Sequence, residues 1–241
     1  MGILPIKKSE KNTNLSDQVI LVYGRPKIGK STLCSYFDDA VFLATEPGLN
    51  HLEVNKVNIT SWKKFLEACA ELAGGKHNFK TVIVDTVDNL ITYCSDYVCT
   101  ENNIDHPSEL PHGKGWSMVT TELKRAVIKL AALPYGLIMV SHAKQEEIET
   151  KTKKYNRFSP DLSGKNKSVV LNMQDIILFM DSGMKDGEEV GIVRTKPSLF
   201  WDAGDKSKLL APEIMFPLAN PKVAYDKIKQ AFSKPTTKET K

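Results

Sequence analysis

The sequence predicts an α/β fold in which a mostly parallel β-sheet is covered by helices on both faces. Short apolar runs of the kind found in buried strands alternate along the 241 residues with longer stretches whose apolar residues recur at helical spacing. The first apolar run leads directly into a glycine-rich segment, residues 24–31, and then into a stretch that can form a helix. Strands that alternate with helices in this way are typical of parallel sheets.

Six apolar runs are expected to form the strands of this sheet, and each is bounded by polar or turn-forming residues. A β-hairpin or loop insertion is expected near residues 144–160, between the fourth and fifth strands. The six predicted strands are residues 19–23, 40–44, 81–84, 137–140, 176–180 and 190–194.

Three long helices are expected from apolar residues that recur three or four positions apart. A shorter helix is expected at residues 32–37. We expect a flexible N-terminal tail over residues 1–16, a core over residues 17–218, and a C-terminal helix with a basic tail over residues 219–241. The apolar stripes of the long helices are Trp62, Phe65, Leu66, Cys69 and Leu72; Val87, Leu90, Ile91, Cys94 and Val98; and Trp116, Val119, Leu123, Val127 and Leu130.

The composition is that of an ordinary globular domain, with 41% hydrophobic and 26% charged residues. No apolar run approaches the ~18 residues of a membrane-spanning helix. The N-terminus also lacks the apolar core of a secretory signal. We therefore expect a cytoplasmic protein with no membrane partner.

The four cysteines lie in stretches that are expected to be helical, and we interpret them as small buried residues in a reducing compartment. Cys94, Cys99, His106 and His112 offer an alternative as a zinc site. The four residues between the two cysteines make a wider gap than the tight knuckle of common zinc sites, so the apolar interpretation is favoured.

Residues 24–31 read Gly-Arg-Pro-Lys-Ile-Gly-Lys-Ser, which is the Walker A pattern of phosphate-binding loops. Glycines let such a loop wrap tightly, so that backbone N–H groups point at phosphate oxygens. Lys30 is expected to be exposed and to reach the β- and γ-phosphates of ATP, while the Ser31 hydroxyl ligates Mg²⁺. The predicted nucleotide-binding residues are Gly24, Arg25, Pro26, Lys27, Ile28, Gly29, Lys30, Ser31 and Thr32.

Polar residues at the ends of three later strands are candidates for the chemistry, because ligands bind at the carboxyl ends of parallel strands. Asp85 is expected to hold Mg²⁺; the alternative is that it caps the next helix, although Asp88 can take that role. Glu46 is the candidate base for the attacking water, provided that its strand lies beside the strand before residue 24; the alternative is a surface acid. His142 is expected to donate a hydrogen bond to the γ-phosphate, or else to be a locally satisfied histidine. Lys30, Glu46 and His142 are the predicted catalytic residues.

Two segments are strongly basic. Residues 151–158 hold four cations and two aromatic rings, and residues 222–241 hold six lysines against Asp226 and Glu239. Such runs usually form a solvated face. Cations interleaved with aromatic rings also suit contact with a single-stranded nucleic acid.

The arrangement of these motifs resembles that of the RecA-like ATPases. Glu46, at the end of the strand after the P-loop helix, resembles their catalytic glutamate; Thr86 stands beside Asp85, where other P-loop classes usually have an acid. Ser141-His142 occupies the place of their polar sensor, ahead of a DNA-binding loop. The resemblance places Lys151, Lys153, Lys154, Tyr155 and Arg157 in that loop.

More narrowly, the chain resembles phage-encoded RecA-like core ATPases of the single-strand DNA recombination type. The resemblance spans residues 17–218. It implies ATP and Mg²⁺ as cofactors, single-stranded DNA as partner, and a homo-oligomer that forms a ring or a filament. It also implies a single-strand DNA-binding protein as a further partner and the host bacterial cytoplasm as location. The matching stretches are residues 45–48, 113–116, 140–144, 194–197 and 203–206.

The same resemblance implies cations that act on a neighbouring subunit's ATP. Arg194 and Lys196 resemble the paired basic residues that RecA-type subunits insert into the adjacent site. We expect the pair to project from the end of a strand, with both side chains on one face. Lys206 stands where many members have arginine; it keeps the charge but lacks the planar guanidinium.

Two other functions remain open on the sequence. The first is a nucleotide-gated loader or assembly ATPase that acts on a protein partner and has no intrinsic DNA affinity. The second is a small-molecule kinase, which normally needs an arginine-rich lid. The chain has four arginines, Arg25, Arg125, Arg157 and Arg194, and this number is small for such a lid.

Overall fold

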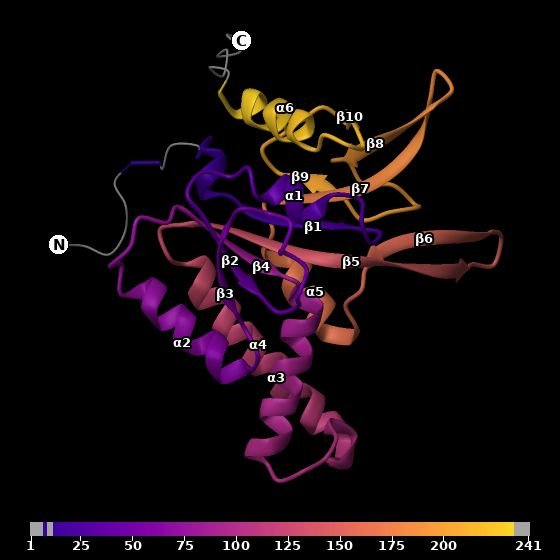
Figure 1. The fold of residues 1–241 in the computed structure, drawn as a ribbon. Helices are drawn as coiled ribbons and strands as arrows, with labels where there is room; N and C mark the ends of the chain where they lie inside the picture. Colours follow the sequence, from indigo (N-terminus) through magenta and orange to yellow (C-terminus); the bar gives the residue numbers. More distant parts are fainter. Residues whose placement is uncertain (1–6, 9–11, 234–241) are drawn as a thin grey trace.

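The structure, a computed structural model, describes residues 7–8 and 12–233 and is built around one ten-stranded sheet (Figure 1). Its main path runs in the order β10-β8-β7-β1-β5-β4-β2-β3, while β6 pairs with β5 and β9 with β7. The strands are β1 (Val19–Gly24), β2 (Ala40–Ala44), β3 (Asn55–Asn58), β4 (Thr81–Asp85), β5 (Gly136–Glu149), β6 (Lys154–Pro160), β7 (Ile176–Lys185), β8 (Glu188–Arg194), β9 (Gly204–Asp205) and β10 (Glu213–Pro217).

Most of the sheet is parallel, as predicted. Strands β3, β2, β4, β5, β1 and β7 all run in the same direction. Strands β8 and β10 extend the β7 edge in antiparallel fashion. Strand β5 continues beyond the sheet and pairs with β6 in an antiparallel hairpin, which confirms the insertion predicted near residues 144–160.

Helices cover both faces of the sheet (Figure 1). α2, α3, α4 and α5 lie on one face, where they pack on strand residues such as Leu21, Val84 and Met139. α1 and α6 lie on the other face, over residues of opposite parity such as Val22 and Ile83. The helices are α1 (Lys30–Cys34), α2 (Trp62–Ala73), α3 (Val87–Glu101), α4 (Lys114–Ala131), α5 (Gly164–Met173) and α6 (Lys222–Ser233), with short 3-10 turns η1 (Leu15–Asp17), η2 (Pro107–Glu109) and η3 (Pro111–Gly113).

The structure differs from the predicted elements where local pattern and tertiary packing disagree. The helix expected at residues 32–37 is instead α1, which begins at Lys30 and ends at Cys34. Trp116 was expected in the apolar stripe of α4 but is 45% exposed, whereas Val119, Leu123, Val127 and Leu130 are buried. Strand β3 was not predicted because it is polar and mostly exposed at the sheet edge.

Both ends of the described chain pack against the core. Leu15, within the predicted tail, is buried, and α6 buries Ala224 and Ile228. Residues 1–6, 9–11 and 234–241 of the two predicted tails lie outside the described part. The four cysteines are free, and three of them are buried.

Two features of the described residues bear on membrane and metal binding. None of the described helices is long and apolar enough to span a membrane. Within residues 7–8 and 12–233, no three His, Cys, Asp or Glu side chains gather as a metal-binding cluster, so the zinc alternative for Cys94 and Cys99 has no support there.

Candidate nucleotide-binding site

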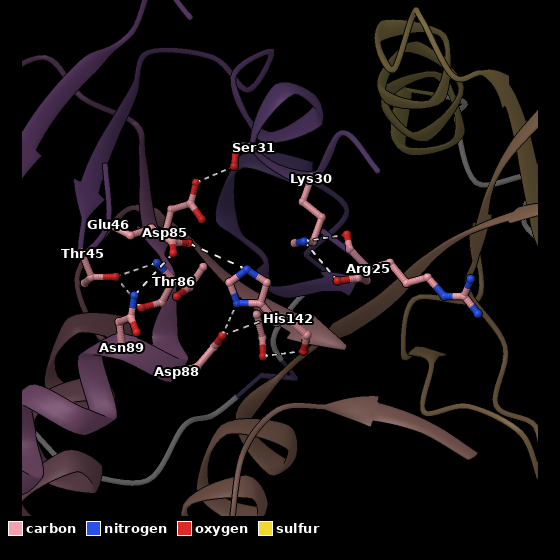
Figure 2. A network of polar contacts seen from close by, with 12 residues as sticks. Arg25, Lys30, Ser31, Thr45, Glu46, Asp85, Thr86, Asp88, Asn89 and His142 are labelled. Carbon is pink, nitrogen blue, oxygen red and sulfur yellow. Dashed lines mark hydrogen bonds and ion pairs between the residues drawn. The ribbon is translucent and has the colours of Figure 1, made fainter. Parts of the chain in front are cut away.

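The predicted site residues meet at the carboxyl edge of the parallel sheet. Gly24 ends β1 and lies in register with His142 of the adjacent β5. Asp85 ends β4 and lies in register with Val140 on one side and Ala44 on the other. Glu46 follows β2 directly after Thr45. Residues far apart in the sequence therefore form one polar cluster (Figure 2).

The glycine-rich loop is tightly packed at both of its glycines. A Cβ atom at Gly24 would lie 2.4 Å from the carbonyl oxygen of Met180 on β7. Gly29 has a φ of +94°, and a Cβ there would lie 2.8 Å from the Pro221 ring. Both positions therefore require glycine, one for close approach to a strand and the other for a left-handed backbone.

Lys30 is not exposed as predicted. It is 8% exposed, and its Nζ donates hydrogen bonds of 3.0 Å to the carbonyl oxygens of Gly24 and Arg25. The loop wraps around the ammonium group, so that carbonyl oxygens replace water as its acceptors. Burial lowers the pKa of Lys30, and the charge of Asp85 opposes this shift.

Ser31 and Asp85 form the contact expected of a Walker A and Walker B pair. The Ser31 Oγ donates a 2.6 Å hydrogen bond to Asp85 Oδ2. Burial raises the pKa of Asp85, and the bond from Ser31 opposes that shift. A hydroxyl and a carboxylate oxygen are hard donors of the type that Mg²⁺ prefers, so this pair fits the metal that the motif implies.

The alternative role of Asp85 as a helix cap is wrong, and so is that role for Asp88. The N-cap of α3 is Thr86. Asp88 is the second residue of the helix, inside its first turn. Asp85 remains the last residue of β4, and its side chain points towards Ser31 (Figure 2).

Glu46 reaches the site by a different route from the one predicted. Its strand does not lie beside the P-loop strand, because β5 and β4 separate β2 from β1. Thr45 anchors the segment: its Oγ1 accepts a 2.7 Å hydrogen bond from the Thr86 N–H and donates a 2.9 Å bond to the Thr86 carbonyl. The Glu46 carboxylate is half-buried, with Oε2 3.5 Å from Asn89 Nδ2.

His142 lies between two carboxylates. Its Nδ1 is 2.6 Å from Asp88 Oδ2, and its Nε2 is 4.0 Å from Glu46 Oε1. The backbone N–H of His142 also donates to Asp88 Oδ2, at 3.2 Å. The alternative of a locally satisfied histidine therefore holds for Nδ1, while Nε2 faces the predicted base (Figure 2).

The predicted DNA-contacting residues lie on the β5–β6 hairpin, where half of their charges are paired. Lys154 is 3.0 Å from Glu147 on the facing strand, and Arg157 is 2.5 Å from Asp202. The hydrogen bond that Arg157 donates to Asp202 raises the pKa of Arg157. Lys151 and Lys153 lie at the exposed turn and make no ion pair with any described residue.

Aromatic rings join the hairpin to the rest of the molecule. The Tyr155 ring lies 5.8 Å from that of Phe200, which is 49% exposed. The guanidinium of Arg25, within the glycine-rich loop, lies 5.1 Å from the centre of the Phe158 ring on β6. This contact between loop and hairpin was not predicted, because nothing in the spacing of these two residues signals it.

The predicted pair of Arg194 and Lys196 does not project together from a strand end. Strand β8 ends at Arg194, and Lys196 lies beyond it, exposed. Arg194 is ion-paired with Glu213 and lies 4.1 Å from the Trp201 ring centre. Lys206 is 3.4 Å from Asp175. Arg194 and Lys206 therefore have acidic partners within their own subunit.

Asp88 and Asn89 are site residues whose contacts were missed by sequence reasoning. They place two polar side chains of one α3 turn against His142 and Glu46. The sequence suggests Asp88 as a capping residue or as the next candidate base after Glu46, but not as a partner of His142, which lies 54 residues away in the chain.

Comparison with known proteins places the chain among nucleotide-binding domains. The sequence model of the AAA domain family matches residues 16–207, which is most of the chain. With the sheet topology, this match confirms the predicted fold class of an α/β P-loop NTPase, with a mostly parallel sheet flanked by helices.

Two individual proteins are also similar. The SPbeta prophage-derived uncharacterized protein YorG of Bacillus subtilis (strain 168) is 28% identical over 178 residues, which are 71% of this chain and 53% of YorG. The chain thus spans about half the length of this curated relative. The crystal structure of a KaiC-like protein from Pyrococcus horikoshii OT3 is similar over 74% of this chain and 78% of that chain, with 13% identity and a TM-score of 0.44.

Proposed function

The chain belongs to the AAA domain family of P-loop ATPases, and we propose that it hydrolyses ATP with the help of Mg²⁺ and acts on single-stranded DNA. The observation that supports hydrolysis most directly is the 2.6 Å contact between Ser31 and Asp85. It joins the hydroxyl of the glycine-rich loop to the carboxylate of a strand two places away in the sheet. Mg²⁺ held by this pair would neutralise phosphate charge.

The remaining site residues divide the chemical work. Lys30 donates to the β- and γ-phosphate oxygens after exchanging its two carbonyl partners for them. Glu46 accepts a proton from the attacking water, since its carboxylate is half-buried and lies at the strand-end cluster. His142 presents Nε2 on the same side as Glu46, where it accepts a hydrogen bond from the attacking water; the donation to the γ-phosphate expected from the sequence would require a proton on Nε2.

Single-stranded DNA is proposed as the partner of the hairpin. Lys151 and Lys153 are exposed at its turn, and Tyr155 and the exposed Phe200 form an aromatic pair beside it. Unpaired cations next to aromatic rings suit a chain of phosphates and bases. The contact of Arg25 with Phe158 offers a route by which the nucleotide loop is coupled to this surface.

A homo-oligomer is proposed as the working form, with a single-strand DNA-binding protein as a further partner. Lys196 is exposed and makes no ion pair with a described residue, so it suits a role at a neighbour's ATP better than Arg194 or Lys206. A cation supplied in this way is worth on the order of 10³-fold in rate.

A loader or assembly ATPase that acts on a protein partner remains the second candidate. It is favoured by the paired charges of the hairpin, where Glu147 and Asp202 neutralise Lys154 and Arg157. Such pairing lowers the positive potential that a nucleic acid needs and leaves a mixed-charge surface that a protein can match.

One experiment separates these functions. ATP hydrolysis is measured with Mg²⁺ or a chelator, with and without single-stranded DNA, and over a range of protein concentrations alongside the mass of the assembly. We expect Mg²⁺-dependent turnover that rises with DNA and with assembly. If the protein does not bind single-stranded DNA and its turnover does not change when DNA is added, the protein-partner function is the one that remains. If turnover per subunit does not change with assembly, the proposed role of Lys196 is contradicted.

A further inference from the structure

Among the described residues, the Asp88 carboxylate forms hydrogen bonds with one residue, His142. Its Oδ2 is 2.6 Å from the ring Nδ1 and 3.2 Å from the backbone nitrogen of that histidine. Its Oδ1 is buried and has no hydrogen-bond partner among the described residues. A buried carboxylate oxygen without a hydrogen-bond partner is costly, so its position beside the site calls for a reason.

The first turn of α3 makes two contacts to the site at once. Asp88 binds His142 at the end of the buried part of β5, and the next residue, Asn89, lies 3.5 Å from Glu46. The turn follows directly from Asp85 through Thr86, whose N–H is bonded to Thr45. Asp88 is thus held by the same backbone that holds the predicted metal ligand and the predicted base.

The contact determines which ring nitrogen of His142 faces the reaction. An ionised carboxylate can only accept hydrogen bonds, so the short contact requires the proton on Nδ1. The backbone bond to the same oxygen restricts rotation of the ring. Nε2 is then directed towards Glu46, 4.0 Å from its Oε1, a separation at which one water can donate a hydrogen bond to each group.

We propose that Asp88 is a positioning residue for hydrolysis: it holds His142 in the Nδ1-protonated form, with Nε2 aimed at the space beside Glu46. This rests on the proposed function for its kinetic consequences. Its structural part, the state of the His142 ring, does not depend on hydrolysis. The competing explanation is that Asp88 simply stabilises the start of α3 as a negative charge at a helix N-terminus.

The ring state is tested by nitrogen NMR of the histidine side chains at a pH where the ring is neutral. The chain has five histidines, and the signal lost in His142→Gln identifies the ring. We expect the Nδ1-protonated form in the wild type, a shift towards the Nε2-protonated form in Asp88→Ala, and a smaller shift in Asp88→Asn, which keeps an oxygen acceptor. A wild-type ring protonated on Nε2, or a ring unchanged in Asp88→Ala, overturns the proposal.

The kinetic role is tested by a double-mutant cycle. Asp88→Ala is expected to lower kcat about 10- to 100-fold with little change in KM for ATP, as loss of an orienting group does. In the His142→Gln background the same change should alter kcat by less than about twofold, because glutamine has no ring tautomer for Asp88 to fix. Equal losses in both backgrounds would assign Asp88 to helix stability and contradict the proposal.

A matched control lies on the same helix. Asp96 is exposed on α3 and its carboxylate makes no ion pair with a described residue, so Asp96→Ala should keep wild-type kcat and wild-type NMR signals. If the wild-type protein shows no hydrolysis, the proposed function fails, while the NMR experiment still decides whether Asp88 sets the state of the ring.

Discussion

The two halves of strand β5 serve two different regions of the molecule. Residues 136–141 are all buried between β1 and β4 and lead to the nucleotide site. Residues 142–149 are half-buried or exposed; beyond the site they pair with β6 to form the hairpin. The buried half and its neighbouring strands hold the polar side chains of the nucleotide site in fixed positions. In the second half, one ion pair, Glu147 with Lys154, joins the two strands at the exposed surface. Binding at the hairpin should therefore depend on charge and salt, whereas activity at the site should depend on geometry.

The largest expected effect is at the buried end of this comparison. Lys30→Ala should lower kcat/KM by on the order of 10³-fold, because the ammonium is a fixed donor to developing phosphate charge. Its thermal midpoint should shift by less than about 4 °C, because loss of the buried stem and of two hydrogen bonds is offset by removal of a buried charge. Steady-state kinetics and a melting curve measure the two quantities.

Lys76→Ala, at an exposed position after α2, is the control for this change and should behave as wild type. Wild-type turnover in Lys30→Ala would remove the phosphate-binding assignment of residues 24–31.

Glu46→Gln should separate chemistry from binding. The amide keeps the size of the side chain and an oxygen that can accept from Asn89, but it cannot take up a proton. Turnover should fall by about 100-fold with affinity for Mg²⁺–ATP retained. Turnover within about twofold of wild type would make Glu46 a structural acid and Asp88 the next carboxylate to test as base. The exposed Glu53→Gln is the matched control.

At the hairpin, loss of cations should alter DNA binding and leave basal hydrolysis intact. Lys151→Ala with Lys153→Ala should reduce the salt slope of single-strand affinity by about 1.4, since each contact releases ~0.7 of a counterion. Adding Lys154→Ala and Arg157→Ala should reduce it by less than a further 1.4, because these two cations already have acidic partners.

Lys124→Ala with Lys129→Ala, two exposed positions on α4, is the control for charge alone. A salt slope that is the same in the hairpin variant and in this control would mean that the hairpin cations form a solvated face.

The smallest expected effect sharpens the choice between DNA and a protein partner. Glu147→Gln removes an acid from the hairpin and frees Lys154 from its ion pair. Single-strand affinity should rise by about twofold to threefold at low salt and return to the wild-type value at high salt. Glu67→Gln, which frees Lys64 on α2, is the control. A lower affinity for DNA in this variant, or the absence of measurable DNA binding, would favour the protein partner.

The local sequence pattern was enough to predict strands with a continuous apolar run and helices with a regular apolar stripe. The runs at residues 40–44 and 81–84 appear as β2 and β4, and the stripes of α2 and α3 are largely buried. Strand β3 has no apolar run, and Trp116 keeps helical spacing while lying outside the core. Both failures arise because burial is decided by which element lies alongside, and local spacing does not contain that information.

The sequence by itself determined which residue types end the strands: a glycine-rich loop after β1, Glu46 after β2, Asp85 at the end of β4 and His142 within β5. Strand order decided the rest. Since β5 lies between β1 and β4, His142 comes to lie against Asp88, and Glu46 reaches the cluster although its strand is not beside the P-loop strand. Contacts such as these, the burial of Lys30 and the ion pair of Arg194 depend on pairings between distant segments, whose energies appear only when the sheet has formed.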